Sequence, residues 1–449
     1  MYKVIILLFA ILLSGVALKA QNKPDPKEVD RITLSLFTAG KWDEVIDKCE
    51  SAIDEGVDFY VLRFRAGVSY YKKEDYLSAA THFEKALIFN PVDIVSMEYL
   101  YYSYLFVGRE SEELALISVM PLKLKKKLQV YSKFIYGAYT EGGYTFNSDF
   151  SEQRQNGFQR LPNLYNEQKI GNGITYIDLG LMHQIGKNVK IFQSYNNVSA
   201  TYNEQIMEKI NGLKNFDTKT AQDEYYLNIN FNLGKAWNLI TAFHYMYTRS
   251  EDVDLRYDSI VFPWISHYDL VKTPENDFIA LLGITKLTGH FRLGLKNSLS
   301  NMNNASQLQN TAEIVFYPLG NLNLYTITNA TFFTNKQWGG ETKSSGILDQ
   351  MAGWKVFENL WMEAGYTFGY IYNYNELDGF IIFNNSDRIS NRVSLNLISP
   401  ISRHIQLSFR YQYLNQELST LYYISPKNFN TNITNNTNHK IIGGFKWIF

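Results

Sequence analysis

The sequence predicts a chain of two parts: a short helical solenoid, then an antiparallel transmembrane β-barrel of about 14 strands. Two observations predict this fold class. The hydrophobic period changes from that of helices to that of strands near Tyr131, and no apolar run beyond Gln21 is long enough for a membrane helix. The bilayer core offers no hydrogen-bond partners, so every backbone group that crosses it must be paired within the protein. A chain without a membrane helix can therefore cross the bilayer only as a closed barrel.

Composition excludes several classes of protein. The 449 residues are 45% hydrophobic and 19% charged, with a formal net charge of −1, which excludes disordered and collagen-like chains. The near-neutral charge argues against a nucleic-acid partner. Cys49 is the single cysteine, so one chain can form neither a disulfide nor a thiolate metal cage. The 33 Tyr, 29 Phe and 7 Trp are concentrated after residue 130 and indicate aromatic rings on an outer surface.

Residues 1–20 have the pattern of a cleavable secretory signal. Lys3 precedes the apolar run 4–13, and small residues lead up to Gln21. An anchoring helix is the alternative, but the run is too short to span a bilayer and no charged stop follows it. We therefore expect a secreted chain from which residues 1–20 are removed.

Residues 21–127 have helical periodicity and an internal repeat of 34 residues. At this spacing Gly40 aligns with Glu74 and Gly108, and Trp42 aligns with Tyr76. About two and a half such units would form a solenoid close to the minimum length that buries its own faces.

The segment 60–94 resembles the tetratricopeptide (TPR) repeat. In that family small residues let paired helices approach, aromatic residues fill the space between them, and a proline follows the second helix. The residues at those positions are Gly67, Tyr70, Ala79, Phe83, Ala86 and Pro91. The flanking copies match less well, and an unrelated helical hairpin is the alternative. The resemblance implies a concave face that binds a partner protein and does no chemistry.

From residue 131 onward, apolar and polar side chains alternate with a period of two. The clearest segment is 405–413, and the pattern recurs in 225–233 and 360–370. Soluble β-sandwiches also alternate, so this pattern alone leaves both classes open.

The connections between strands decide in favour of a barrel, because tight turns alternate with long polar stretches as in bacterial outer-membrane proteins. Tight turns are expected at 186–188, 234–236, 288–289, 320–321, 358–359 and 402–403. Long polar loops are expected at 145–169, 205–222, 250–276 and 416–436. Counting by these turns gives about fourteen strands in 128–449, an even number that places both barrel ends on the periplasmic side.

The C-terminal segment resembles the assembly signal of outer-membrane proteins. Phe445, Trp447 and Phe449 lie on one face of a strand, and the chain ends on an aromatic residue. The resemblance implies recognition by the barrel-assembly machinery and contact with outer-membrane lipid. It also implies that the barrel resides in the outer membrane with the helical domain in the periplasm.

No catalytic constellation is evident. The 7 His are scattered, and no HExxH, GxSxG or phosphate-loop pattern occurs. His244 on an inward face could orient a serine, and Glu251, Asp252, Asp254 and Asp258 could hold calcium. A hydrogen-bonded lumen histidine and a solvated loop are the favoured interpretations. We expect a non-enzymatic protein with no cofactor and no metal.

Strand parity places more cations than acids inside the predicted barrel. The inward cations are Lys190, Arg292, Lys296, Arg392, Arg410, Lys440 and Lys446, and the clearest inward acids are Asp178 and Glu363. A positive interior would favour anionic solutes or polymers. An interior ladder of ion pairs that blocks the lumen is equally compatible with the pattern.

The order of signal, TPR segment and barrel resembles two classes, exopolysaccharide exporters and surface lipoprotein assembly modulators. The exporters usually carry more repeats than this chain shows. The resemblance implies a non-enzymatic factor whose TPR domain recruits a periplasmic or outer-membrane protein for export or assembly of surface protein, lipoprotein or polysaccharide. The alternatives are an accessory structural subunit of a larger outer-membrane complex and a solute porin.

Overall fold

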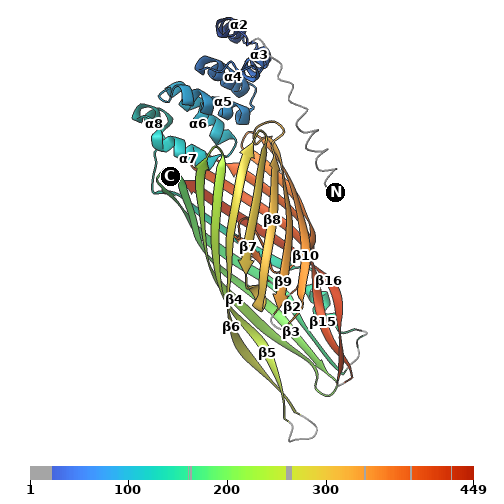
Figure 1. The fold of residues 1–449 in the computed structure, drawn as a ribbon. Helices are drawn as coiled ribbons and strands as arrows, with labels where there is room; N and C mark the ends of the chain where they lie inside the picture. The colour runs from blue at the N-terminus through green and yellow to red at the C-terminus, as the bar shows by residue number, and fades with distance from the viewer. Residues whose placement is uncertain are drawn as a thin grey trace, which may run out of the picture. The chain divides into compact units, whose positions relative to one another are not determined.

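The computed structural model describes residues 23–449, apart from 160, 162–163, 259–264, 338–339, 385–386 and 426. The expected signal at 1–20 lies outside these residues. The described chain divides into two compact units, one that ends at Ser103 and one that runs from Tyr104 to Phe449. Within the described ranges, no helix combines the length and the apolar character needed to cross a bilayer. Figure 1 shows the helices and the barrel strands.

Helices before the barrel are joined in pairs by one kind of turn. The helices are α2 (Pro26–Thr38), α3 (Trp42–Asp54), α4 (Tyr60–Lys72), α5 (Tyr76–Phe89), α6 (Ile94–Phe106), α7 (Glu110–Val119) and α8 (Leu122–Leu128). Gly40, Glu74 and Gly108 follow the first helix of each pair, with φ of 70°, 63° and 67°. In all three turns the next residue donates its N–H to the carbonyl five residues earlier, as in a Schellman motif. The predicted 34-residue period is therefore confirmed as a structural repeat.

Close packing of α4 on α5 depends on Gly67. A Cβ at this position would lie 2.9 Å from ring atoms of Phe83, so only glycine lets the two helices approach this far. Phe83, Ala79 and Ala86 are fully buried on α5. The helix ends at Phe89, shortly before Pro91, whose ring cannot continue it.

Tyr70 links three helices of the N-terminal unit. Its ring stacks on His82 of α5 at a centroid distance of 5.3 Å, and its hydroxyl donates to Glu50 of α3 at 3.0 Å. The residues at the TPR-like positions thus all lie in or beside the α4–α5 pair.

The second unit contains α7, α8 and a closed barrel of fourteen antiparallel strands, in which β1 pairs with β16. The strands are β1 (Ile135–Asn147), β2 (Tyr165–Ile185), β3 (Val189–Glu208), β4 (Gly212–Gly234), β5 (Trp237–Asp258), β6 (Ile265–Thr288), β7 (Phe291–Ser300), β8 (Ala305–Phe316), β9 (Leu324–Gln337), β10 (Thr342–Phe357), β11 (Leu360–Ile371), β14 (Ile389–Pro400), β15 (Ile405–Ser425) and β16 (Asn428–Ile448). The predicted strand number is confirmed.

The six predicted tight turns all lie at one end of the barrel, where β1 begins and β16 ends. We call this the turn end and the opposite one the distal end. Gly186, Gly234 and Gly289 have positive φ in these turns, which allows so short a connection.

The prediction of long polar loops was wrong for three of the four stretches. Segments 205–222, 250–276 and 416–436 are mostly strand, and β5 pairs with β6 as far as Asp258 and Ile265. Water reaches both faces of a strand that projects beyond the bilayer, so its side chains need not alternate, although the backbone ladder continues. Among the described residues of the four stretches, a helix occurs only in 145–169, where α9 (Phe150–Asn156) precedes β2.

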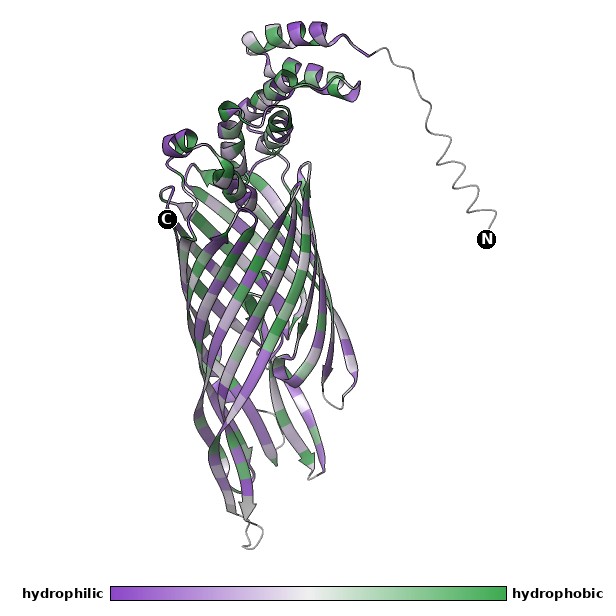
Figure 2. Ribbon diagram, turned by 60° about the vertical axis from the view of Figure 1, so that its left-hand side comes forward, coloured by the Kyte–Doolittle hydropathy of each residue, from purple (hydrophilic) through white to green (hydrophobic). Residues whose placement is uncertain are grey.

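Exposed aromatic residues form belts on the outside of the barrel. Tyr195, Tyr225, Tyr245 and Phe278 are cross-strand neighbours on β3 to β6, with exposed fractions of 39% to 48%. Such rings suit a bilayer interface, because their bodies are apolar and the tyrosine tips are polar. At the turn end, the exposed aromatic residues are Trp237, Phe291, Phe357, Trp447 and Phe449. Between the belts, hydrophobic and hydrophilic residues alternate along the strands (Figure 2).

The C-terminal strand follows the predicted parity. Trp447 is 47% exposed and meets Phe449 edge-on at 4.9 Å, whereas Lys446 on the opposite face contacts Glu110 inside. Trp447 and Phe449 of the predicted assembly signal therefore belong to the aromatic belt at the turn end.

Replacing Phe445 with Asp should reduce the yield of folded barrel, because a carboxylate on the lipid-facing side costs about 1 to 2 kcal/mol and the terminal aromatic pattern is interrupted. Heat-modifiable gel mobility of membrane fractions measures the folded share. Asn435→Asp, on the exposed distal part of the same strand, is the matched control and should fold like the wild type. Equal folding of both variants would show that Phe445 does not face lipid.

Candidate functional site in the barrel lumen

The connection between β11 and β14 folds back into the barrel. It contains two short strands, β12 (Tyr374–Glu376) and β13 (Ile381–Phe383), which pair with each other and form a sheet separate from the wall. We call residues 372–384 the luminal hairpin. Sequence reasoning missed this hairpin, because it treated the segment as an ordinary connection. The apolar run Ile381–Phe383, in a connection that should be polar, was the available signal.

Hydrogen bonds join the luminal hairpin to several strands of the wall. Asn375 donates to Ser298 Oγ on β7 at 3.0 Å, and Tyr226 on β4 donates its hydroxyl to the carbonyl of Asp378 at 3.0 Å. His244 on β5 bonds the carbonyl of Gly379 at 2.8 Å. The hairpin therefore reaches wall strands far from its own neighbours β11 and β14.

Two groups of ion pairs hold the luminal hairpin in place. Arg392 on β14, only 4% exposed, contacts both oxygens of Glu376 at 2.8 Å and Asp349 on β10 at 3.2 Å. Lys296 on β7 contacts Asp378 at 2.7 Å and Glu313 on β8 at 2.9 Å. We call these two groups of ion pairs the clamps. Because a buried charge without a partner is costly, each clamp favours the inward position of the hairpin.

Aromatic packing completes the contact between hairpin and wall. The ring of Phe380 lies 5.1 Å from Tyr226, 5.6 Å from Phe192 and 6.4 Å from Tyr139, measured between centroids. Tyr374 belongs to a buried cluster with wall residues, among them Phe333. The hairpin thus supplies apolar surface to the interior of the barrel.

Helix α7 approaches the lumen from the turn end. Its Glu110 carboxylate contacts Lys190 on β3 at 2.8 Å and Lys446 on β16 at 3.6 Å. Gln184 on β2 donates to the carbonyl of Leu114 at 3.2 Å. Wall residues at the turn end therefore bind α7 directly.

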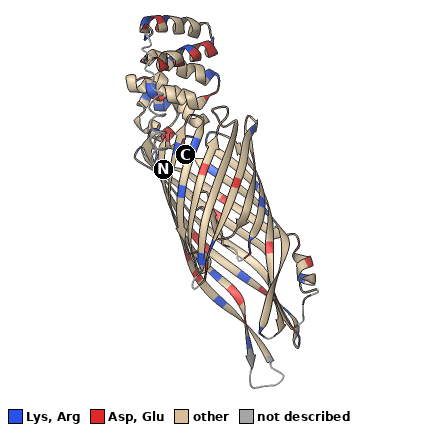
Figure 3. Ribbon diagram, turned by 45° about the vertical axis from the view of Figure 1, so that its right-hand side comes forward, with Lys and Arg blue, Asp and Glu red and all other residues tan. Residues whose placement is uncertain are grey.

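Most of the inward cations predicted by parity lie in ion pairs. Lys190, Arg292, Lys296, Arg392 and Lys446 each contact a carboxylate, and for Arg292 it is Glu313 at 3.0 Å. The acids that parity did not count lie on the hairpin, on α7 and on neighbouring strands. Figure 3 shows positive and negative residues interspersed along the barrel.

Arg410 and Lys440 differ from the other five cations. The Nε of Arg410 donates to Asn396 at 3.1 Å, and the ammonium of Lys440 lies 4.8 Å from the ring centroid of Tyr176. Among the residues that the structure describes, no carboxylate forms an ion pair with either side chain.

His244 lies within the hydrogen-bond network of the lumen. It is 2% exposed and bonds Glu224 at 3.1 Å in addition to the hairpin carbonyl. The acids considered for calcium lie on a strand and not in a loop, and Asp252 pairs with Lys169 at 2.6 Å. Over the described ranges, no group of three or more His, Cys, Asp or Glu is arranged to hold a metal ion.

Comparison with known proteins finds structural similarity without a sequence match. No protein-family model and no curated protein sequence matches the chain. Among solved structures, the toluene transporter TodX of Pseudomonas putida aligns with 75% of this chain and 92% of its own, at 7% identity and a TM-score of 0.47. A Pseudomonas aeruginosa FadL homologue aligns with 74% and 92%, at 12% identity and 0.45. A bacterial polysaccharide outer membrane secretin aligns with 71% and 99%, at 8% identity and 0.35.

The pKa values of two glutamates on α7 are shifted in opposite directions. Burial and the neighbouring Glu110 carboxylate raise the pKa of Glu113 to about 8, although Lys190 and Lys446 act against this. Burial opposes the shift at Glu110, but the same two ammonium groups hold the pKa of Glu110 well below its usual range. Glu113 therefore binds a proton more tightly in the folded chain than in the unfolded one.

We expect the contact of α7 with the barrel to weaken as the pH rises from 5 to 8. In this window the folded chain retains a proton on Glu113 that the unfolded chain loses, so the free energy of local opening falls with pH. Hydrogen-exchange protection factors of α7 amides, corrected for intrinsic rates, measure it. Glu113→Gln should abolish the fall and Glu112→Gln should keep it. Equal wild-type protection at both pH values would contradict this assignment.

Proposed function

We propose that this protein is an outer-membrane barrel that forms a gated conduit, with the luminal hairpin as the gate. The observation that carries the proposal is a hairpin that lies inside the barrel and bonds strands β4, β5, β7 and β14. An open diffusion porin needs a continuous water path, and a hairpin in this position reduces it.

Release of the luminal hairpin would leave the wall intact. Among the described residues, its two strands pair with each other, and its hydrogen bonds to the wall involve side chains and single backbone groups, such as the carbonyl of Asp378 and the N–H of Asn375. No ladder of backbone hydrogen bonds in the wall has to open. The ion pairs of Arg392 and Lys296 can be exchanged for water if the lumen hydrates, so displacement of the hairpin is a limited change.

The outer-membrane location and the orientation are part of the proposal. Apolar side chains face outward between two belts of aromatic residues, as in barrels that cross a bilayer. Short turns face the periplasm in bacterial outer-membrane barrels, and the chain enters β1 at the turn end. The helical unit would then lie in the periplasm.

We further propose that the helical unit is a TPR-like module that recruits a periplasmic or outer-membrane partner for export or assembly. The 34-residue repeat of identical turns and the packing of Gly67 on Phe83 support this. A conduit that is closed at rest needs a signal to open, and a partner-binding module provides one. A role without enzymatic chemistry is proposed on the same grounds.

Replacing Arg392 with Gln should raise the ionic conductance of the purified protein in planar bilayers, because Glu376 and Asp349 then lie buried without their cation and the hairpin loses its main clamp. We expect the wild type to conduct in rare events and the variant to conduct for at least about tenfold more of the time, as expected for a loss of more than 1.4 kcal/mol.

Arg249→Gln is the matched control, since Arg249 lies on the outside and pairs with the partly exposed Asp223. It should conduct like the wild type. If the wild type already conducts steadily and Arg392→Gln changes nothing, the hairpin is no gate and the solute-porin alternative takes its place.

A further inference from the structure

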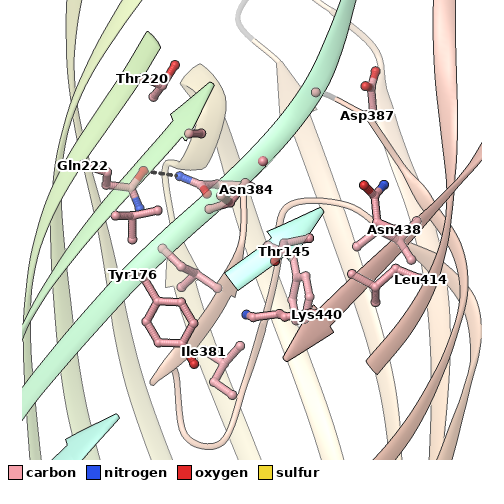
Figure 4. A pocket seen from close by; sticks show the side chains of 18 of the residues that line it. Thr145, Tyr176, Thr220, Gln222, Ile381, Asn384, Asp387, Leu414, Asn438 and Lys440 are labelled. Atoms are coloured by element: carbon pink, nitrogen blue, oxygen red, sulfur yellow. Dashed lines mark hydrogen bonds between the residues drawn. The ribbon is translucent and has the colours of Figure 1, made fainter. Parts of the chain in front are cut away.

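A cavity of about 410 Å³ lies in the lumen beside the luminal hairpin. Residues 380–384 form one side of it, and strands of the wall form the other (Figure 4). Its size is that of a site for a small molecule. The residues that line it include neither Arg392 and Lys296 of the clamps nor any residue of α7.

Polar uncharged side chains make up much of the wall of this cavity. They include Thr145, Thr220, Gln222, Gln412, Asn436 and Asn438. Asn436 is 3% exposed, and its side-chain oxygen has no hydrogen-bond partner among the described residues, as is also true of Asn196 Oδ1. Buried amide oxygens without partners are costly, and hydroxyl groups of a ligand would satisfy them.

Both luminal cations that lack a carboxylate partner, Lys440 and Arg410, line the same cavity. Figure 4 shows Lys440 directed toward Tyr176 and Ile381. The nearby acid Glu141 is engaged elsewhere, because its two oxygens accept hydroxyl groups of Tyr139 and Tyr176 at 2.6 Å each. The two cations therefore keep hydrogen-bonding capacity for an anion.

Five other acids line the cavity, namely Asp178, Glu224, Asp252, Glu275 and Asp387, and Glu275 Oε1 has no hydrogen-bond partner among the described residues. Glu224 accepts from Asn196 at 2.8 Å, and Asp252 pairs with Lys169. Asp178 accepts from Ser194 with one oxygen, while its other oxygen has no partner. Arg410 and Lys440 lie on β15 and β16, whereas Asp178 and Glu224 lie on β2 and β4 and Asp252 and Glu275 lie on β5 and β6. The carboxylate of a ligand would therefore meet cations on the β15–β16 side, where Glu141 on β1 is already bonded to the two tyrosines.

We propose that this cavity binds a small polyhydroxylated carboxylate of the sugar-acid class. The carboxylate of the ligand would lie at Lys440 and Arg410, and its hydroxyl groups would bond the side-chain amides of Asn436 and Asn196. The sugar ring would lie against Tyr176 and the hairpin residue Ile381. The inference rests on the proposed function in one respect, because it makes the ligand a solute that meets the gate inside the conduit. Binding itself requires only the closed barrel.

Isothermal titration calorimetry on the full chain in detergent tests this, with glucuronate as probe. Glucose offers similar hydroxyl groups without a charge, and octanoate offers a carboxylate without hydroxyl groups. Glucuronate should bind at least about tenfold more tightly than either, since charge-assisted hydrogen bonds contribute most of the difference.

Lys440→Gln and Arg410→Gln should each lower the affinity for glucuronate about tenfold or more. Lys343→Gln, at an exposed site on β10, is the control and should bind like the wild type. Lys440→Arg keeps the positive charge and should retain most of the affinity, which separates loss of the anion contact from loss of folding. Heat-modifiable mobility verifies that each variant is folded.

Absence of glucuronate binding to the folded wild type would overturn the proposal. Unchanged affinity in both Gln variants, or octanoate or glucose binding as tightly as glucuronate, would do the same. None of these outcomes bears on the proposal that the luminal hairpin is a gate, because the conductance of Arg392→Gln is measured without ligand. A gate that opens in a barrel that binds no glucuronate would contradict only the ligand class.

Discussion

The width of the barrel is the constraint on which the rest of the structure depends. Eight strands enclose a space that their own side chains can fill, whereas fourteen enclose more than the inward residues of the wall can occupy. The chain fills part of this space with its own backbone, by turning the β11–β14 connection inward. Phe380 and Tyr374 provide the apolar surface that wall residues such as Phe192 and Phe333 need.

The luminal hairpin carries charged side chains, and their ion pairs with the wall determine how firmly the hairpin is held. The wall contributes Arg392 and Lys296, and the hairpin contributes Glu376 and Asp378. Without the wall, Glu376 and Asp378 would lose these cations, whereas without the hairpin Arg392 would keep Asp349 and Lys296 would keep Glu313. The hairpin therefore depends on the wall more than the wall depends on the hairpin. Such contacts are strong in a dry interior and weak in water, which makes the position of the hairpin sensitive to hydration of the lumen.

Periodicity was sufficient to predict the wall. Alternation in 405–413 and the short turns such as 358–359 depend only on neighbouring residues, and both are present in the structure. The spacing of Gly40, Glu74 and Gly108 likewise predicted the 34-residue repeat, and in the structure each of these residues has a positive φ in a turn.

The interior could not be predicted in the same way. Parity gave the direction of Arg392 and Lys296 but not their partners, since Glu376 and Asp378 reach them only after the hairpin turns inward. The distal strands were mistaken for loops, because water on both faces removes the pattern on which the prediction depends. Arg410 and Lys440 were predicted as inward cations. That these two of the seven form no ion pair with a carboxylate among the described residues follows from contacts that no local pattern encodes.

The distal ribbon of β5 and β6 has a consequence for association with other chains. The two strands stay paired out to Asp258 and Ile265, whereas the pairing of β5 with β4 ends at Ser250 and that of β6 with β7 ends at Ile279. Both long edges of the ribbon therefore offer backbone donors and acceptors that another strand could join. Charged side chains line these edges, among them Asp254, Arg256, Asp269 and Lys272. They allow the ribbon to project into water while making edge-to-edge aggregation between neighbouring copies costly.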